Sequence, residues 1–164
     1  MPESKSRKTA AAKAVGACLC GAVQVEIGVP AFWAWHDHSR ASRRAQGCAY
    51  ATYIGVWKSK THIVKGVKSI TRFEDAKART ARSFCSKCGT PIFYERPRAP
   101  KMVNIPRALF DTRTGREPLY HIALDEAAEW EYRGELLKPL KGFPGVMWTG
   151  AKRKKQPIDG DVFA

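Results

Sequence analysis

Four of the five cysteines in the chain occur as two close pairs, a spacing typical of a metal site. The first pair is Cys18-x-Cys20, the second is Cys85-x-x-Cys88, and a glycine directly follows each pair. A structural zinc ion takes four soft ligands in a tetrahedron, which two turns with two thiolates each can supply. Glycine lets the backbone adopt positive φ beside the metal, where amide N–H groups can bond the sulfurs. We therefore expect one structural zinc ion held by these four cysteines.

Four protein ligands leave no open coordination position, so this zinc is expected to support the fold and to take no part in chemistry. The alternative is a set of buried free thiols, which would be an unusual use of four reactive side chains in paired turns. The fifth cysteine, Cys48, stands alone before a β-rich stretch. We expect it to act as a small buried hydrophobic residue.

The elements that position the cysteines are predicted to be short strands. Apolar Val23, Val25 and Ile27 alternate with polar residues over positions 22–27, which is the period of a half-buried strand. Further β-rich stretches are predicted at 32–35, 50–57, 61–64, 69–73, 81–84, 91–94, 102–105 and 120–124. The polar segment 36–46 is expected to form a loop or a short helix, and residues 125–130 one or two helical turns. Many short strands punctuated by Gly and Pro indicate a mainly β fold of antiparallel strands.

A length of 164 residues and 44% hydrophobic content suit one folded domain with tails. We expect a flexible basic arm at 1–14, a zinc-stapled domain at 15–149 and a basic tail at 150–164. No stretch reaches the roughly 18 continuous apolar residues needed to span a bilayer, and the N-terminus lacks the apolar core of a secretory signal. A cytoplasmic location follows as an expectation, with no membrane partner.

The charge balance is strongly basic, with 29 Lys and Arg against 15 Asp and Glu and a net charge of +14. Such a surface attracts nucleic acid, acidic partners or anionic small molecules. Part of the excess lies at the two ends, as expected for solvated tails. No basic run is interleaved with aromatic residues of the kind that stack on the bases of single-stranded nucleic acid. Nucleic-acid binding is therefore possible but not favoured.

Several motifs resemble those of the glutathione-dependent formaldehyde-activating enzyme family, which also includes centromere protein V. The segment 16–23, GACLCGAV, resembles the opening G-x-C-x-C-G-x-V of the family, and segment 84–91, FCSKCGTP, resembles its F-C-x-x-C-G-[ST]-x. The segments 109–111 (LFD) and 118–122 (PLYHI) resemble the later L-D turn and P-x-x-H-I strand, with Trp130 where an aromatic residue usually follows. The resemblance covers roughly residues 15–145. It implies a β-tent fold with a structural four-cysteine zinc.

The resemblance also implies a second, catalytic zinc, held by C-H-C-x-x-C-R and acting as a carbon–sulfur lyase centre on the adduct of glutathione and formaldehyde. The matching segment here is Asp37-His38-Ser39-Arg40-Ala41-Ser42-Arg43, which lacks all three cysteines. Neutral serine hydroxyls are poor zinc ligands, so one carboxylate and two hydroxyls cannot replace three thiolates without loss of most affinity. We expect no catalytic zinc and treat Asp37, His38, Ser39 and Ser42 as the remnant of that pocket.

Other interpretations of this region remain open. His36, Asp37 and His38 could form a cluster of harder metal ligands, although neighbours in a strand point to opposite faces. Asp37 or His38 could also serve a different reaction as an acid or base. Arg43 and Arg44 could hold an anionic ligand such as a glutathione carboxylate, because guanidinium groups suit carboxylates.

The aromatic residues near this region can be interpreted in two ways. They could line a pocket for a small ligand, but alternating aromatics in a small β domain more often fill the core, which is what we expect. The residues concerned are Trp33, Trp35, Tyr53 and Trp57.

Two functions remain as hypotheses. One is a zinc-binding relative of the formaldehyde-activating enzymes that is degenerate or altered in activity. The other is a non-catalytic module that binds an anionic small molecule or nucleic acid.

Overall fold

The structure, a computed structural model, describes residues 12–131 and, beyond them, residues 134, 138–139, 141–142, 144 and 147–148. The chain divides into two compact units, Met1–Glu129 and Trp130–Ala164. In the second unit, β11 (Lys138–Pro139) pairs antiparallel with β12 (Met147–Trp148). The expected domain boundary at residue 149 falls within this unit, and the expected tail at 150–164 lies outside the described residues.

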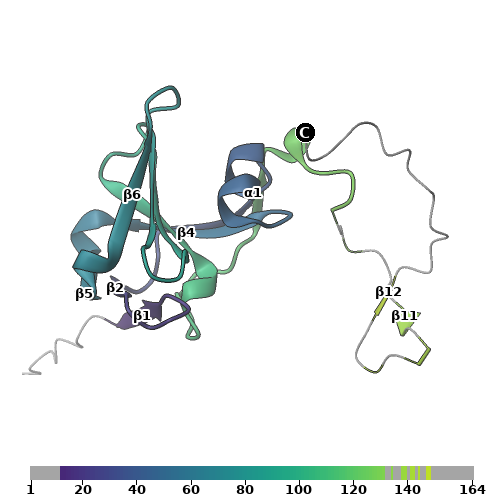
Figure 1. The fold of residues 1–164 in the computed structure, drawn as a ribbon, viewed down its shortest axis with the longest axis horizontal. Coiled ribbons are helices and arrows are strands. Elements are labelled where there is room, and N and C mark those ends of the chain that lie inside the picture. Colours follow the sequence, from purple (N-terminus) through teal and green to yellow (C-terminus); the bar gives the residue numbers. More distant parts are fainter. Residues whose placement is uncertain are drawn as a thin grey trace, which may run out of the picture. The chain divides into compact units, whose positions relative to one another are not determined.

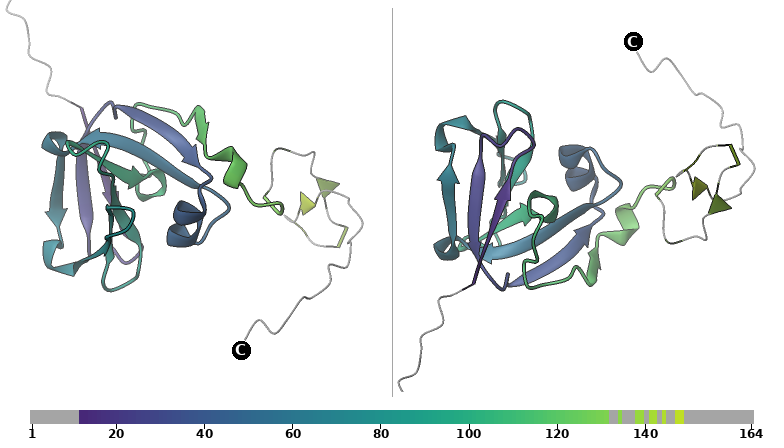
Figure 2. Two further views of the ribbon diagram at one scale, coloured as in Figure 1. Left: turned by 90° about the horizontal axis from the view of Figure 1, so that it is seen from above. Right: turned by 90° about the horizontal axis from the view of Figure 1, so that it is seen from below.

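The first unit contains a three-stranded antiparallel sheet with the order β1-β2-β5. Its strands are β1 (Lys13–Ala17), β2 (Gln24–Gly28) and β5 (Thr61–Lys65). β1 includes the last two residues of the segment expected as an arm, and residues 1–11 lie outside the described part of the chain. In Figure 2, β1 and β2 run side by side in purple.

The second sheet has seven strands in the order β10-β3-β4-β9-β8-β7-β6. All neighbours are antiparallel except β10 and β3, which pair in parallel. The strands are β3 (Trp33–Asp37), β4 (Ala51–Trp57), β6 (Ile70–Asp75), β7 (Thr80–Cys85), β8 (Pro91–Glu95), β9 (Met102–Pro106) and β10 (Tyr120–Ile122). The prediction of a mainly β fold of short antiparallel strands is therefore confirmed.

Helices are short. The α-helix α1 (Arg40–Gln46) lies within the segment expected as a loop or short helix, and it contacts β4 (Figure 1). The described residues also contain four single 3-10 turns: η1 (Lys58–Lys60), η2 (Val67–Ser69), η3 (Arg107–Leu109) and η4 (Leu124–Glu126). None of the helices among the described residues has the length and apolarity that crossing a membrane demands.

The main core contains residues from both sheets. Val25 and Ile27 of β2 belong to the same buried cluster as Ile54 of β4 and Ile105 of β9. A second, smaller cluster contains Trp35, Ala51 and Tyr53. Because Trp35 pairs with Tyr53 while Ala34 pairs with Ile54, these two clusters lie on opposite faces of the seven-stranded sheet.

The expected core role of the aromatic residues is confirmed for Trp35 and Tyr53, which are fully buried. Trp33 is half-buried against them. Trp57 departs from the expectation, because 38% of its surface is exposed and its ring packs edge-on against Phe32. Cys48 is half-buried beside the same aromatic cluster, and burial raises the pKa of its thiol.

Candidate metal centre and the neighbouring polar network

The two cysteine pairs come from turns that the strands bring together. Cys18 and Cys20 lie between β1 and β2, where Gly21 has a φ of 68° and donates to the carbonyl of Cys18. Cys85 ends β7, and Cys88 lies in the turn before β8, where Gly89 has a φ of 73°. Both glycines adopt the left-handed conformation that favours this residue type. The glycines after each pair therefore have the backbone role expected from the sequence.

The four sulfur atoms form one cluster. All of them lie within 4.8 Å of one another, with 3.6 Å between Cys18 Sγ and Cys20 Sγ and 3.9 Å between Cys20 Sγ and Cys85 Sγ. A tetrahedral zinc site with Zn–S bonds of about 2.3 Å has sulfurs about 3.8 Å apart, so the spacing and the soft donor set fit zinc. Within the described residues, this is the one group of three or more His, Cys, Asp or Glu side chains that could hold a metal ion.

Hydrogen bonds orient the thiols. The backbone N–H of Val23 donates to Cys18 Sγ over 3.2 Å. Thr90 connects the two turns, because its hydroxyl lies 3.1 Å from Cys88 Sγ and accepts the backbone N–H of Leu19 at 3.1 Å. Such contacts fix the direction of a ligand and tune its basicity. Thr90 was not identified as a site residue from the sequence, although it occupies the Ser/Thr position that follows C-x-x-C-G in the family motif.

The thiols differ in acidity. Hydrogen bonds from the hydroxyl and backbone N–H of Thr90, and from the backbone N–H of Cys20, lower the pKa of Cys88 to about 6. The backbone N–H of Ala22 acts to lower the pKa of Cys20, but the other thiols and desolvation outweigh it and raise this pKa to about 11. Four crowded thiols cannot all ionise without a compensating cation. The cluster therefore suits a divalent metal ion.

The segment that resembles the second metal site forms a hydrogen-bonded network. Asp37 is buried at the end of β3, where its carboxylate accepts the backbone N–H of Ser39 at 3.0 Å and the hydroxyl of Ser42 at 2.9 Å. Ser42 is fully buried, and its hydroxyl also accepts Arg82 Nη2 at 3.3 Å. Arg82 Nη1 donates to the hydroxyl of Tyr53 at 3.0 Å. We call Asp37, Ser39, Ser42 and Arg82 the polar network.

Ser39 is also the N-cap of α1. Its hydroxyl accepts the backbone N–H of Ser42 at 3.3 Å, and Gly47 ends the helix in the left-handed conformation. Serine is among the best N-cap residues because its side chain satisfies a backbone donor that the helix leaves unpaired. The three residues aligned with the thiolates of the family therefore take part in capping and hydrogen bonding.

Arg82 was missed by the sequence analysis. It follows the buried Ala81 in β7, so alternation placed it on the other face of the strand, but nothing in the pattern showed that the chain would cover it. Its guanidinium carbon lies 3.8 Å from the centre of the Tyr94 ring, a favourable cation–π contact.

The histidines lie on the other side of the strand from Asp37. His38 is buried, with Nε2 2.9 Å from Nδ1 of His121, and the ring of His36 also packs against His121. Burial first, and then the neighbouring histidines, lower the pKa of His36. His36, Asp37 and His38 thus do not converge on one point, in line with the alternation of side chains along a strand.

The two arginines of the candidate anion site differ in their surroundings. Arg43 donates to the carbonyl of His38 at 3.1 Å and to the carbonyl of Glu126 at 2.8 Å, so it links α1 to η4. Arg44 is exposed on α1. The structure does not bring the two guanidinium groups to a common acceptor.

Comparisons with known proteins agree with this fold. The model of the glutathione-dependent formaldehyde-activating enzyme family matches residues 13–126. A crystal structure of a Rhodobacter sphaeroides protein, a Northeast Structural Genomics target, superposes with a TM-score of 0.51 at 22% sequence identity, covering 60% of this chain and 89% of that chain. A comparison with curated protein sequences gave no match.

The fold and the family match define a mainly β member of an enzyme family, with a cysteine cluster that could hold a metal ion. The chain belongs to the glutathione-dependent formaldehyde-activating enzyme family.

Proposed function

We propose that the protein keeps the structural zinc of its family and lacks the second, catalytic zinc, so that it is degenerate or altered as a carbon–sulfur lyase. Support for the structural zinc comes from the close sulfurs of Cys18, Cys20, Cys85 and Cys88. Support for the loss of the second zinc comes from the polar network, in which Ser42 is bonded to both Asp37 and Arg82.

The side chains of the polar network do not fit a zinc ion. Both oxygens of Asp37 already accept hydrogen bonds, and Ser39 caps α1. A guanidinium group bonded to Ser42 places a positive charge where a dication would have to enter, and two hydroxyls are weak ligands for zinc. The donor set in this segment therefore gives no support for a zinc-assisted step on the glutathione–formaldehyde adduct.

The zinc content of the purified protein tests this proposal. We expect one zinc per chain of 164 residues and none after Cys85→Ser and Cys88→Ser are combined. Turnover of the glutathione–formaldehyde adduct, followed by the loss of adduct with time, should stay at the uncatalysed rate. Two zinc ions per chain, or turnover that a chelator abolishes, would contradict the proposal.

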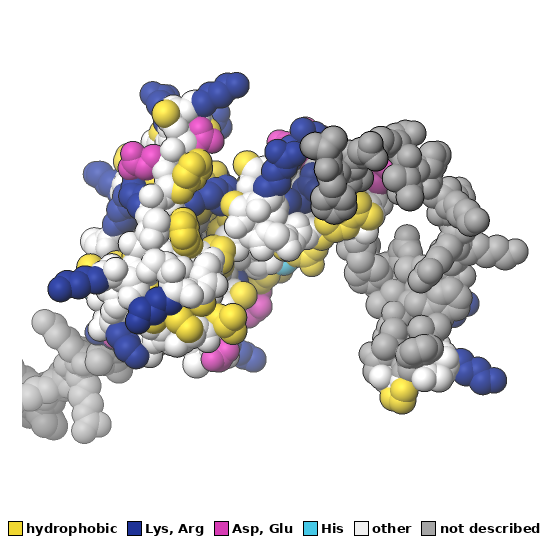
Figure 3. Space-filling model, in the orientation of Figure 1, with side chains coloured by type: hydrophobic (Ala, Val, Ile, Leu, Met, Phe, Trp, Pro, Cys, Tyr) yellow, Lys and Arg dark blue, Asp and Glu magenta, His cyan; other side chains and the backbone are white. Residues whose placement is uncertain are grey.

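A second candidate function is the binding of an anion. The net charge of +14 favours it, and Lys and Arg side chains are spread over the visible face of residues 12–129 in Figure 3, with Asp and Glu among them. This distribution supports a small anion more than a long nucleic-acid strand, which needs a continuous basic track. We also propose that the protein is located in the cytoplasm.

Nucleic-acid binding has its own test. A gel-shift titration with duplex DNA at two salt concentrations should show weak binding that does not discriminate between sequences. Tight binding that depends on Arg43 and Arg44 would instead support a nucleic-acid function, whereas weak non-specific binding is lost as salt is raised.

A further inference from the structure

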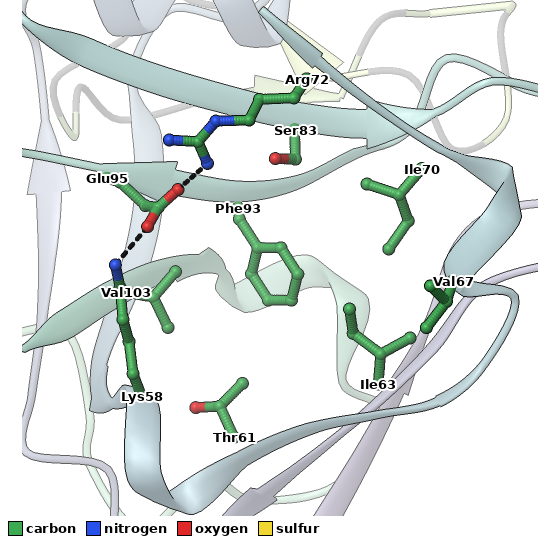
Figure 4. Close-up of a pocket in the computed structure, with 10 residues that line it drawn as sticks. All are labelled: Lys58, Thr61, Ile63, Val67, Ile70, Arg72, Ser83, Phe93, Glu95 and Val103. Atoms are coloured by element: carbon green, nitrogen blue, oxygen red, sulfur yellow. Dashed lines mark hydrogen bonds and ion pairs between the residues drawn. The ribbon is translucent and has the colours of Figure 1, made fainter. Parts of the chain in front are cut away.

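A cavity of about 440 Å³ lies between β5 and the part of the large sheet formed by β6, β7, β8 and β9 (Figure 4). This volume is within the range of small-molecule sites in proteins. Its lining residues combine a group of apolar side chains with three charged ones.

The cavity and the polar network lie on opposite faces of the large sheet. Ser83, which lines the cavity, pairs with Phe93 on one side and with Arg72 on the other. Its neighbour Arg82 belongs to the polar network, and successive residues of a strand point to opposite faces. The cavity is therefore separate from the segment that aligns with the catalytic centre of the family.

The apolar part of the cavity leaves hydrophobic surface in contact with solvent. Figure 4 shows the Phe93 ring in the middle, with Ile63, Ile70 and Val103 around it and Val67 at one side. Val67 is 62% exposed. Covering such side chains with an apolar ligand is favourable because it removes hydrocarbon surface from water.

The charged side chains of the lining are two cations and one carboxylate, and Arg72 is also paired with Glu74, which lies outside the lining. Glu95 forms ion pairs with both Lys58 and Arg72, which Figure 4 draws as dashed lines. Partial burial acts to raise the pKa of the Glu95 carboxyl, but Lys58 and Arg72 outweigh it and lower this pKa, so the carboxylate is ionised at neutral pH. The group is thus a carboxylate between two cations.

The two cations keep hydrogen-bond donors for a further anion. Arg72 uses Nε for Glu74 at 2.8 Å and Nη1 for Glu95, so among the described residues the hydrogens on Nη2 are available. Lys58 has three donors, and its ion pair with Glu95 needs one. Both side chains are about half exposed, at 46% and 47%, so a ligand can reach them.

We propose that this cavity binds a small organic monocarboxylate with an aromatic or branched apolar body. The body covers Phe93, Ile63 and Ile70, and the carboxylate binds to Lys58 and Arg72. Lys58 keeps two N–H donors and Arg72 keeps the hydrogens on Nη2, so the two oxygens of a single carboxylate can each accept from one of them. The inference deepens the anion-binding function proposed above and does not depend on how many zinc ions the protein holds.

Binding of phenylacetate to the chain of 164 residues tests the inference. Isothermal titration should give saturable binding, and methyl NMR should show shifts at Ile63, Val67 and Ile70. Phenylacetamide keeps the ring without the charge, and acetate keeps the charge without the ring. Each should bind at least about tenfold more weakly than phenylacetate, because either the charge pairing or the apolar contact is missing.

Variants separate the charged contact from general electrostatics. Lys58→Met and Arg72→Met should each weaken phenylacetate binding about tenfold, while Lys77→Met, the same change of charge at an exposed turn, should leave it unaltered. Val67→Ser changes an exposed residue of the apolar part and should also weaken binding. Thermal unfolding of each variant confirms that it folds.

Several results would overturn the inference. They are the absence of saturable binding, equal affinity for phenylacetamide, or shifts confined to the other face around Ala45 and Phe84. Shifts of the same methyl groups on raising protein concentration without ligand would show that a second copy of the chain occupies the cavity. Zinc content and adduct turnover are measured separately, so failure here leaves the proposal on the second zinc intact.

Discussion

At the scale of single residues, Thr90 makes hydrogen bonds to both of the turns that carry the cysteine pairs. Its hydroxyl contacts the sulfur of Cys88 and accepts the N–H of Leu19, and its carbonyl accepts the N–H of Cys85 at 2.9 Å. Thr90 therefore bonds to both turns of the candidate metal centre. Removal of its hydroxyl leaves the backbone bond in place and tests the side chain alone.

Thr90→Val should weaken zinc binding about tenfold, as is usual when a hydrogen bond to a metal ligand is lost. It should also lower the free energy of unfolding by about 1 kcal/mol. Competition with a chromogenic chelator measures the first effect and urea unfolding the second. Thr112→Val, at an exposed position, is the matched control. Unchanged zinc affinity in Thr90→Val would show that the hydroxyl does not tune the ligand.

At the scale of elements, the connection from β5 to β6 depends on one glycine. Gly66 has a φ of 79°, and a Cβ built on it would lie 1.9 Å from the carbonyl oxygen of Ala22. The turn therefore passes directly against the backbone that leads from the first cysteine pair into β2.

Gly66→Ala should destabilise the fold by more than about 3 kcal/mol, because it combines an unfavourable backbone conformation with a clash against backbone atoms. Gly47→Ala is the matched control, since Gly47 has a similar φ of 63° but no atom within 4 Å of the added Cβ. The control should cost about 1 kcal/mol. Chemical unfolding of both variants measures the difference, and equal losses would refute the close contact.

Most elements were predictable because their alternation is carried by large apolar side chains. Residues 61–64 and 102–105 were expected as strands and are part of β5 and β9. β1 was missed for a physical reason. Its buried positions are Ala14 and Gly16, whose small side chains give no hydrophobic signal, whereas Val15 points outward with 49% of its surface exposed. Gly16 must be small because a Cβ there would lie about 3 Å from Phe110.

The candidate site was also predictable only in part. Cys18 and Cys88 were identifiable because thiols in paired turns have few other uses, and the loss of thiolates at Asp37 and Ser42 was visible in the sequence. The residues that hydrogen-bond to Asp37 and Ser42 could not be identified from the sequence. Arg82 reaches Ser42 across 40 positions of the chain, and such a contact follows from the order of the strands in the sheet, which spacing alone does not reveal.

At the scale of the whole molecule, the proposed zinc ion would connect the small sheet to the large one. Cys18 and Cys20 lead into β2, whereas Cys85 ends β7. The backbone bond from Cys85 to Thr90 closes only the second turn. The two turns are linked by the exposed bond from Leu19 to Thr90 and by the backbone N–H of Cys20, which donates to the sulfur of Cys88. The ion would add a much stronger cross-link.

Removal of zinc with a chelator should therefore cost at least ~3 kcal/mol and lower the unfolding temperature by about 10 °C. Calorimetry before and after chelation measures the shift, and added zinc should reverse it. Cys48→Ser should show the same response as the unchanged protein, because Cys48 lies outside the cluster. An unfolding temperature that is insensitive to chelation would argue against a structural metal.

The separation of the two cysteine turns has a consequence for biosynthesis. Cys20 and Cys85 are 65 positions apart, so the whole stretch between the two turns must be synthesised and leave the ribosome before a metal ion can find all its ligands. Until then β1 and β2 have only the first pair of thiols beside them. In a zinc-starved cell, more chains would lack the cross-link between the small and the large sheet and would be open to proteolysis. The abundance of the protein would then fall as the zinc concentration falls.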